Sequence, residues 1–167
     1  MGKVPTTSDP DAMAIYQEHL DTMTAALLAG EFDTFERRVS YPLTVRTLSN
    51  DFIVEARPKC ECMFNDMHSC LHAGGITEII RIATSARFVT PDEIIGSHES
   101  HKMRGAVRAS PPYENHVRLT RGEDGLWRET HSANAVENKA GKFAISAPPA
   151  HWAKAPDLFT SSERKPE

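Results

Sequence analysis

The pair Gly74-Gly75 separates two parts of the chain that differ in hydrophobic period, and this separation constrains the fold more than any other feature. Before the pair, apolar residues recur mostly at spacings of three and four, which is typical of helices with one buried face. After it, residues 76–136 are rich in β-branched side chains, which indicates consecutive strands. Helices gathered on one side of a mostly antiparallel sheet form an α+β fold, and we expect that class here.

The first helix is predicted to begin at Pro10, with Asp9 as its N-cap, and to end at Gly30. Its buried face is predicted to contain Met13, Tyr16, Leu20, Met23 and Leu27. The tyrosine in this stripe fits two roles, a packed side chain with one satisfied hydroxyl or a proton donor to a pocket. A short second helix is expected from residue 32 or 33 to about residue 39.

Short strands are predicted to make up most of the remaining chain. Residues 43–48 and 52–56 are expected to form a hairpin, because Ser49-Asn50-Asp51 between them is typical of a turn. Beyond Gly75 we expect four strands, of which the last two flank the turn at residues 122–125. These four strands are predicted at residues 76–89, 92–109, 116–121 and 126–136.

The three cysteines of the chain lie in a third predicted helix, which begins at Arg57-Pro58 and ends at Gly74. Its buried face is predicted to contain Cys60, Met63, Phe64, Met67, Cys70 and Leu71. An odd number of cysteines, in a chain with no apolar signal segment at its start, favours free thiols in a reducing cytoplasm.

Cysteines and histidines this dense raise the question of a zinc site. On a straight helix Cys62 lies about 160° from Cys60, so the thiolates cannot meet within the ~2.3 Å of one ion that zinc requires. His68 and His72 share a helical face, but the sequence identifies no third ligand for them. We therefore expect no metal site, and since no nucleotide-binding loop or haem motif is present, no cofactor.

The order of these elements resembles the nuclear transport factor two-like superfamily, which includes SnoaL-like and ketosteroid-isomerase-like proteins. Three segments carry the resemblance: "AALLAGEFDTFERRV" at 25–39, "YPLTVRT" at 41–47 and "RLTRGEDGLWRETHSANAV" at 118–136. The resemblance covers residues 9–136 and implies a curved, mostly antiparallel sheet wrapped around the long first helix. It also implies an interior pocket and a homodimer formed through the outer face of the sheet.

Residues outside this cone-fold domain are expected to be less ordered. Residues 1–8 are predicted to be a disordered N-terminus. Residues 137–167 are rich in Pro, Ala, Lys, Ser and Glu and are predicted to be an extended, partly flexible tail. Trp152 and Phe159 are the residues through which this tail is expected to contact the domain.

The ketosteroid isomerase site does not carry over to this sequence. The position that resembles its catalytic tyrosine is occupied by Met23, which cannot donate a hydrogen bond. The first hairpin, where that enzyme has its proton-abstracting aspartate, contains no carboxylate in "LTVRT". Ketosteroid-type isomerisation is therefore disfavoured.

Candidate site residues come from the alternation of side chains along the last strand. Trp127, Glu129 and His131 share a face of a regular strand, and the resemblance implies that the tryptophan's face turns inward. A carboxylate and an imidazole about 7 Å apart along the strand suit proton transfer, with Tyr16 as a donor. The alternatives are that this pair lies at a solvated rim, or that Arg128 and Thr130 face inward instead.

The segment "GSHESHKMR" offers a second polar cluster. Glu99 and His101 lie on one face with Met103, which favours them as pocket residues, and Met13 on the first helix is predicted to join them. Ile94 and Ala106 favour the opposite face, which carries His98, Ser100 and Lys102. A polar strand exposed to solvent is a further interpretation.

Two main functions remain open at this stage, and a metal enzyme ranks third behind them. The first is a pocket for a small hydrophobic molecule, either for binding alone or for a lyase or isomerase step. The second is a non-catalytic dimeric association module whose core is filled by Met13, Met23, Met63, Met67 and Phe64. A net charge of −4 gives no reason to expect nucleic acid as a partner, and no apolar run is long enough to cross a membrane.

Overall fold

The computed structural model describes residues 8–136 and 154–156. Within these described residues there are three helices: α1 (Pro10–Ala29), α2 (Phe32–Glu36) and α3 (Arg57–Ala73). The helix starts follow from local chemistry, because the Asp9 carboxylate accepts from the amides of Asp11 and Ala12, and Gly30 ends α1 in a left-handed conformation. These bounds confirm the predicted start and end of the first helix. The second helix is shorter than predicted.

The strands are β1 (Val39–Arg46), β2 (Asp51–Val54), β3 (Glu78–Thr90), β4 (Glu93–Arg104), β5 (Val107–Arg108), β6 (Tyr113–Arg121) and β7 (Trp127–Asn134). They form one sheet in the order β2-β1-β7-β6-β4-β3, and β5 pairs with β4. Strands β1 and β7 pair in parallel and the other pairs are antiparallel. The fold is therefore α+β, as expected.

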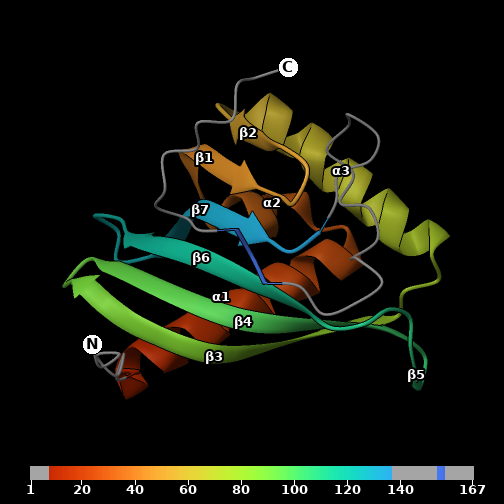
Figure 1. Ribbon diagram of the computed structural model, residues 1–167. Helices are drawn as coiled ribbons and strands as arrows, with labels where there is room; N and C mark the ends of the chain where they lie inside the picture. The colour runs from red at the N-terminus through yellow and green to blue at the C-terminus, as the bar shows by residue number, and fades with distance from the viewer. Residues whose placement is uncertain (1–7, 137–153, 157–167) are drawn as a thin grey trace.

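The helices lie on one side of the sheet (Figure 1). The N-terminal half of α1 packs on β3, β4 and β6 through a cluster that includes Tyr16, Leu20 and Ile94. The C-terminal half of α1 packs with α2, α3 and the hairpin β1–β2 in a second cluster, in which Phe64 is almost completely buried. This arrangement leaves α1 and α3 facing the inner side of the sheet, and that side is where a site can form.

The third helix differs in one respect from its predicted buried face. Cys60, Met63, Phe64, Met67 and Leu71 are buried, but Cys70 is exposed, and Cys62 is exposed as expected. Cys70 lies at the border of the apolar stripe, and Leu71 points more directly at the core. The three thiols are free.

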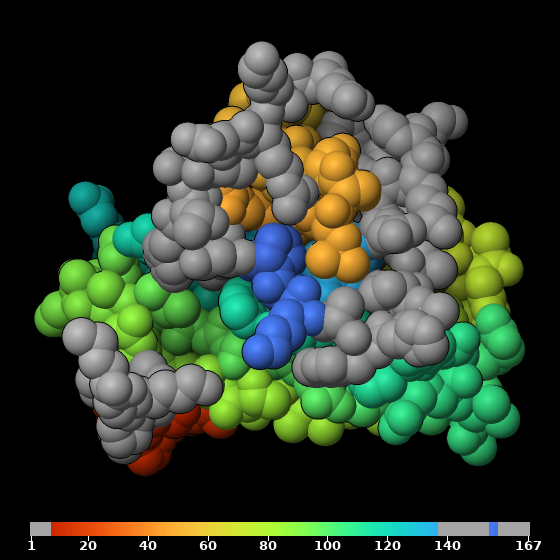
Figure 2. Space-filling view, viewed as in Figure 1, coloured from red at the N-terminus to blue at the C-terminus, as the bar shows by residue number. Residues whose placement is uncertain are grey.

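The expectations for the two ends of the chain fall mostly outside the described residues, and these include Trp152 and Phe159. Of the C-terminal segment, residues 154–156 lie beside β6, visible in Figure 2, where the Ala155 amide donates to the Glu114 carboxylate at 3.1 Å. Among the helices of the described residues, none is long and apolar enough to cross a membrane.

Candidate functional site

Two adjoining cavities lie between the helices and the inner face of the sheet. The larger has a volume of about 380 Å³ and is bounded by α3, β3, β4 and the start of β6. The smaller, of about 70 Å³, is bounded by α1, α3 and the inner faces of β1, β3, β4, β6 and β7. Leu27, Met67 and Arg81 line both cavities, so the two share a boundary.

The larger cavity is mostly apolar. Its lining includes Leu27, Met67, Leu71, Ile76 and Ile79. Its volume lies within the roughly 300–1,000 Å³ that is usual for small-molecule sites. The smaller cavity differs in character, because several polar side chains reach it: His19, Arg81, His98, Glu129, Ser132 and Asn134.

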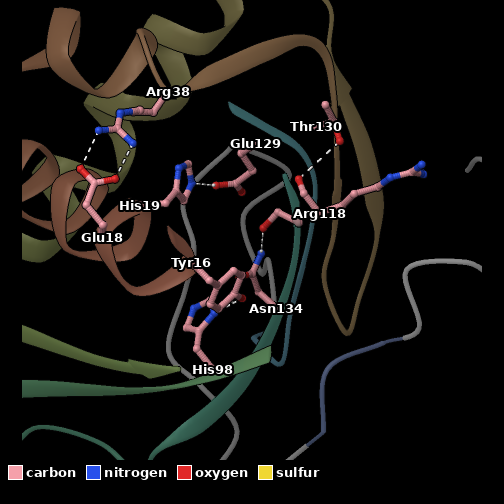
Figure 3. Close-up of polar contacts among 10 residues, drawn as sticks. Tyr16, Glu18, His19, Arg38, His98, Arg118, Glu129, Thr130 and Asn134 are labelled. Atoms are coloured by element: carbon pink, nitrogen blue, oxygen red, sulfur yellow. Dashed lines mark hydrogen bonds and ion pairs between the residues drawn. The ribbon is translucent and has the colours of Figure 1, made fainter. Parts of the chain in front are cut away.

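His19 and Glu129 form the first polar pair of the smaller cavity. Their side chains approach from α1 and β7, with His19 Nε2 3.2 Å from Glu129 Oε2 (Figure 3). The His19 side chain is 1% exposed and the Glu129 side chain 13%. His19 Nδ1 is buried without a hydrogen-bond partner. The pair therefore presents a carboxylate, held in place by an imidazole, to an interior space.

Tyr16 and His98 form the second pair, with the tyrosine hydroxyl 2.7 Å from His98 Nδ1. Burial raises the pKa of Tyr16 well above its ordinary value, and the nearby Glu129 carboxylate adds to this. Burial lowers the pKa of His98 well below its ordinary value, and the Arg81 cation adds to this. Both residues are therefore neutral near pH 7 and share a proton in one hydrogen bond.

The position of Tyr16 depends on a glycine in β4. A Cβ atom added at Gly96 would lie only 2.5 Å from the Tyr16 ring. The ring therefore rests directly on the backbone of β4, which brings its hydroxyl level with His98, two residues further along the same face. Of the two roles considered for Tyr16, that of a packed side chain with one satisfied hydroxyl describes this geometry.

The expected pairing of Glu129 with His131 is wrong. In the ladder between β6 and β7, Leu119 pairs with Glu129 and Arg118 with His131, so Thr130 is an extra residue in a β-bulge. Beyond the bulge Ser132 faces inward with Val45 and Val117, while His131 lies on the outer face beside Arg118. Burial and the cations Arg118 and Arg46 lower the pKa of His131.

The residues expected to line the pocket are placed elsewhere. On β4 the buried side chains are Ile94, His98 and Ser100, so Glu99 and His101 face outward, where they pair at 2.7 Å. The inward side chains of β4 are those that alternate with Ile94. Met103, near the end of the strand, does not indicate which face is inward. Trp127 and Met13 pack against the cluster around Tyr16, and neither borders the two cavities.

The polar residues of the smaller cavity that were not predicted as site residues are His19, Arg81, His98, Ser132 and Asn134. A signal for His19 was available, since it lies three residues after Tyr16 and four before Met23, on the predicted buried face of α1. His98 lies on the face of β4 that Ile94 favours, so the sequence-based preference for the opposite face is wrong. No pattern in the sequence predicts the β-bulge at Thr130.

A polar network links three strands next to the smaller cavity. Ser100 donates to Asn115 at 2.6 Å, Asn115 donates to Asn134 at 2.7 Å, and Asn134 donates to Ser132 at 2.9 Å. These bonds run from β4 through β6 to β7. They provide hydrogen-bond partners for these four side chains and fix the polar groups beside Glu129.

Of the cysteines and histidines of α3, Cys70 lines the larger cavity, and the others line neither cavity. His68 is held by a hydrogen bond from Nδ1 to the Leu27 carbonyl at 2.8 Å, across to α1. Within residues 8–136 and 154–156, no group of three His, Cys, Asp or Glu side chains is arranged to hold a metal ion.

Comparisons with known proteins identify the fold. No family model matches the sequence, and no curated protein matches it. A cystatin-like domain of unknown function from Nostoc punctiforme is 14% identical, with a TM-score of 0.59 over 76% of this chain and 78% of that one. A protein from Novosphingobium aromaticivorans, described as nuclear transport factor two-like with a cystatin-like fold, is 14% identical, with a TM-score of 0.57 over 79% of this chain and 86% of that one.

A third similar structure contains a ligand. It comes from Catenulispora acidiphila, was solved in complex with S-DNPA, and is 15% identical with a TM-score of 0.56 over 74% of this chain and 92% of that one. At these identities the likeness concerns the fold. This chain has the nuclear transport factor two-like, cystatin-like fold.

Proposed function

We propose that this protein binds a small hydrophobic molecule inside the cone that the sheet and α1 form. The observation that carries the proposal is the cavity of about 380 Å³, which is lined mainly by apolar side chains and meets a smaller polar cavity. An apolar space with a few convergent polar groups is the usual form of a small-molecule site. A neighbour of the same fold was solved with a small molecule, S-DNPA, which adds support.

The alternative, an association module with a filled core, receives less support. Met23, Met63 and Met67 were expected to fill the interior of such a module, but they border the cavities. Protein interiors are normally packed as densely as organic crystals, so space of this volume is unusual unless it is used.

A second candidate function is a proton-transfer reaction of the lyase or isomerase type on the bound molecule. It is favoured by the carboxylate of Glu129, which faces the cavity and is oriented by His19. Glu129 would take a proton from a carbon next to a carbonyl, so a C–H bond breaks, an O–H bond forms and the electron pair stays on the ligand. An isomerase returns the proton to another carbon, and a lyase uses the electron pair to expel a leaving group.

We also propose that the protein is a cytoplasmic homodimer that pairs through the outer face of its sheet. Exposed apolar side chains support this surface: Ile82 is 50% exposed and Ile80 is 38% exposed, both on the outer side of the edge strand β3. The free thiols of Cys60, Cys62 and Cys70 support a reducing compartment. Sedimentation of wild type and Ile82→Lys tests the dimer, which the lysine is expected to weaken.

Ligand binding is tested by blocking the larger cavity. Ala109 lines it, whereas Ala106 is exposed on the neighbouring turn, so Ala109→Trp and Ala106→Trp form a matched pair. A panel of hydrophobic carbonyl compounds is expected to raise the Tm of the wild type and of Ala106→Trp, but not of Ala109→Trp. If no compound raises the Tm, or if all three proteins respond equally, the proposal is wrong.

Proton transfer is tested by exchange of carbon-bound hydrogen with deuterated water in any compound that binds. Glu129→Gln is expected to abolish exchange, while His131→Gln, on the outer face of the same strand, is expected to leave it unchanged. Exchange that survives in Glu129→Gln removes the catalytic candidate and leaves the binding proposal intact.

A further inference from the structure

The charges around the larger cavity are all of one sign. Among the described residues that line it, Arg81 and Lys102 are charged and both are cations, while no carboxylate is present. The rest of the lining is apolar or carries small polar groups. A ligand that matches this surface has an apolar body and one anionic group.

Arg81 is an unusual arginine, because it points inward from β3 toward both cavities. Its Nε atom is buried without a hydrogen-bond partner, and it makes no ion pair with any residue in the described parts of the chain. The nearest acid in the cavity, Glu129, is engaged by His19. A buried donor left unsatisfied is destabilising, so the Arg81 Nε–H lacks a partner that an anion would supply.

Lys102 lies next to Arg81 on the inner face of the sheet. In the ladder between β3 and β4, Arg81 pairs with Ser100 and Ile79 with Lys102, so the two cations are diagonal neighbours. Diagonal neighbours on paired strands are about 7–8 Å apart, within reach of long side chains. The Lys102 ammonium is 5.5 Å from the centre of the Tyr113 ring, at the side of the cavity where β6 begins.

Ser110 adds a third donor to the same cavity. Its hydroxyl oxygen is buried and has no hydrogen-bond partner. Two of the four buried polar atoms without partners in the described residues therefore belong to this one cavity, Arg81 Nε and Ser110 Oγ. Unsatisfied donors that converge on a space the size of a small molecule indicate an absent acceptor.

We propose that the ligand is a hydrophobic monocarboxylic acid, whose carboxylate is bound by Arg81 with Lys102 and Ser110, and whose apolar body occupies the cavity of about 380 Å³. The planar guanidinium matches the two oxygens of a carboxylate. This inference rests on the proposed binding function and specifies its ligand class. Because Arg81 borders both cavities, it anchors the acid where the carbons next to the carboxylate lie closest to the polar cavity.

The test compares octanoate with 1-octanol, which has the same number of carbons and no charge, by isothermal titration calorimetry at pH 7.5. The wild type is expected to bind octanoate about 10- to 100-fold more tightly than 1-octanol, the range for hydrogen bonds to a charged group. Arg81→Met is expected to lose most of this preference while still binding 1-octanol. Lys102→Met is expected to lose part of it.

Arg87→Met is the matched control, since Arg87 is exposed on the same strand and lines neither cavity. It is expected to retain the full preference. Arg81→Met is also expected to keep the Tm of the wild type, because it removes an unpartnered buried group, and this separates loss of the anchor from loss of the fold.

Each other outcome overturns a defined part of the inference. Equal affinity for octanoate and 1-octanol leaves the binding function standing and rejects the carboxylate. Tighter binding of octyl phosphate than of octanoate replaces the carboxylate with a phosphate ester. Binding of neither compound, together with no ligand in the thermal-shift panel, rejects both the ligand class and the proposed function.

Discussion

The two halves of α1 pack against different surroundings. In the N-terminal half, Tyr16 and Leu20 are almost completely buried against Ile94 and Leu119. In the C-terminal half, Leu27 is equally shielded from solvent but borders both cavities. The N-terminal half of α1 therefore packs closely on the sheet, and the C-terminal half leaves space between the sheet and α3. The polar pairs His19–Glu129 and Tyr16–His98 lie at the transition.

This difference explains how a small domain can combine a stable fold with an unfilled interior. The close packing around Tyr16 stabilises the fold. The C-terminal half of α1, which borders the cavities, faces α3, and α3 contacts the sheet mainly at the β1–β2 hairpin (Figure 1). The comparison predicts that equivalent substitutions in the two halves have unequal effects.

The largest effect is expected from Leu20→Ala. Leu20 borders only the smaller cavity, of about 70 Å³, whereas Leu27 borders both cavities; Leu20→Ala should therefore lower the free energy of unfolding by about 4 kcal/mol and Leu27→Ala by about 2 kcal/mol. The reason is that Leu27 borders more empty space than Leu20 and loses fewer contacts on truncation. Urea denaturation monitored by circular dichroism measures both. Equal losses would mean that the two halves are packed alike.

The next effect concerns the contact between Tyr16 and β4. Gly96→Ala places a Cβ atom 2.5 Å from the tyrosine ring and should lower the free energy of unfolding by about 2 kcal/mol through overpacking. In a Tyr16→Leu background the same change should be milder, because the ring is absent. A double-mutant cycle measures this coupling, and strictly additive effects would contradict the proposed contact.

The free energy of unfolding should depend on pH because the imidazole of His98 is buried. Because burial and the cation of Arg81 lower the pKa of His98, the unfolded chain binds a proton there below about pH 6.5 while the folded chain does not. Stability contributed by neutral His98 is therefore present above that pH and lost below it, by about 1.4 kcal/mol for each pH unit.

His98→Gln is expected to flatten this slope between pH 6.5 and pH 5. His131→Gln removes a weaker contribution of the same sign, since the pKa of His131 is also lowered. Chemical denaturation at several pH values gives the slopes. A slope that stays unchanged in His98→Gln would show that this residue is protonated in the folded protein.

The smallest effect is expected on the outer side of α3, the helix that covers the open half. Cys62→Ser changes an exposed side chain and should alter the free energy of unfolding by less than about 0.5 kcal/mol. Cys60→Ser, in the buried face of the same helix, should cost more, about 1 kcal/mol or above. A reversed order would mean that the buried face of α3 is misassigned.

Much of the fold could be predicted because local chemistry and global packing agree. Asp9, Gly30 and Arg57-Pro58 mark helix ends whose requirements are local, and the structure has the ends where these residues predict them. The change from helical to strand period at Gly74-Gly75 is confirmed as well. Such features depend on neighbours within a few residues, which a single sequence displays.

The site could be predicted less well, because it depends on register. Glu129 and His131 share a face in any regular strand, and the extra residue Thr130 separates them. A bulge depends on how neighbouring strands pair, and no residue type in β7 predicts its position. On β4 the choice of face depended on whether Ile94 or Met103 pointed inward, and one wrong anchor moved every side chain to the opposite side.

The place of β7 in the sheet has a consequence for synthesis of the protein. This strand, residues 127–134, pairs with β1 on one side and with β6 on the other. The hairpin at residues 39–54 therefore has no backbone bonds to the rest of the sheet until the last strand emerges from the ribosome. A chain stalled before residue 127 would expose two unpaired strand edges, which makes it a substrate for chaperones.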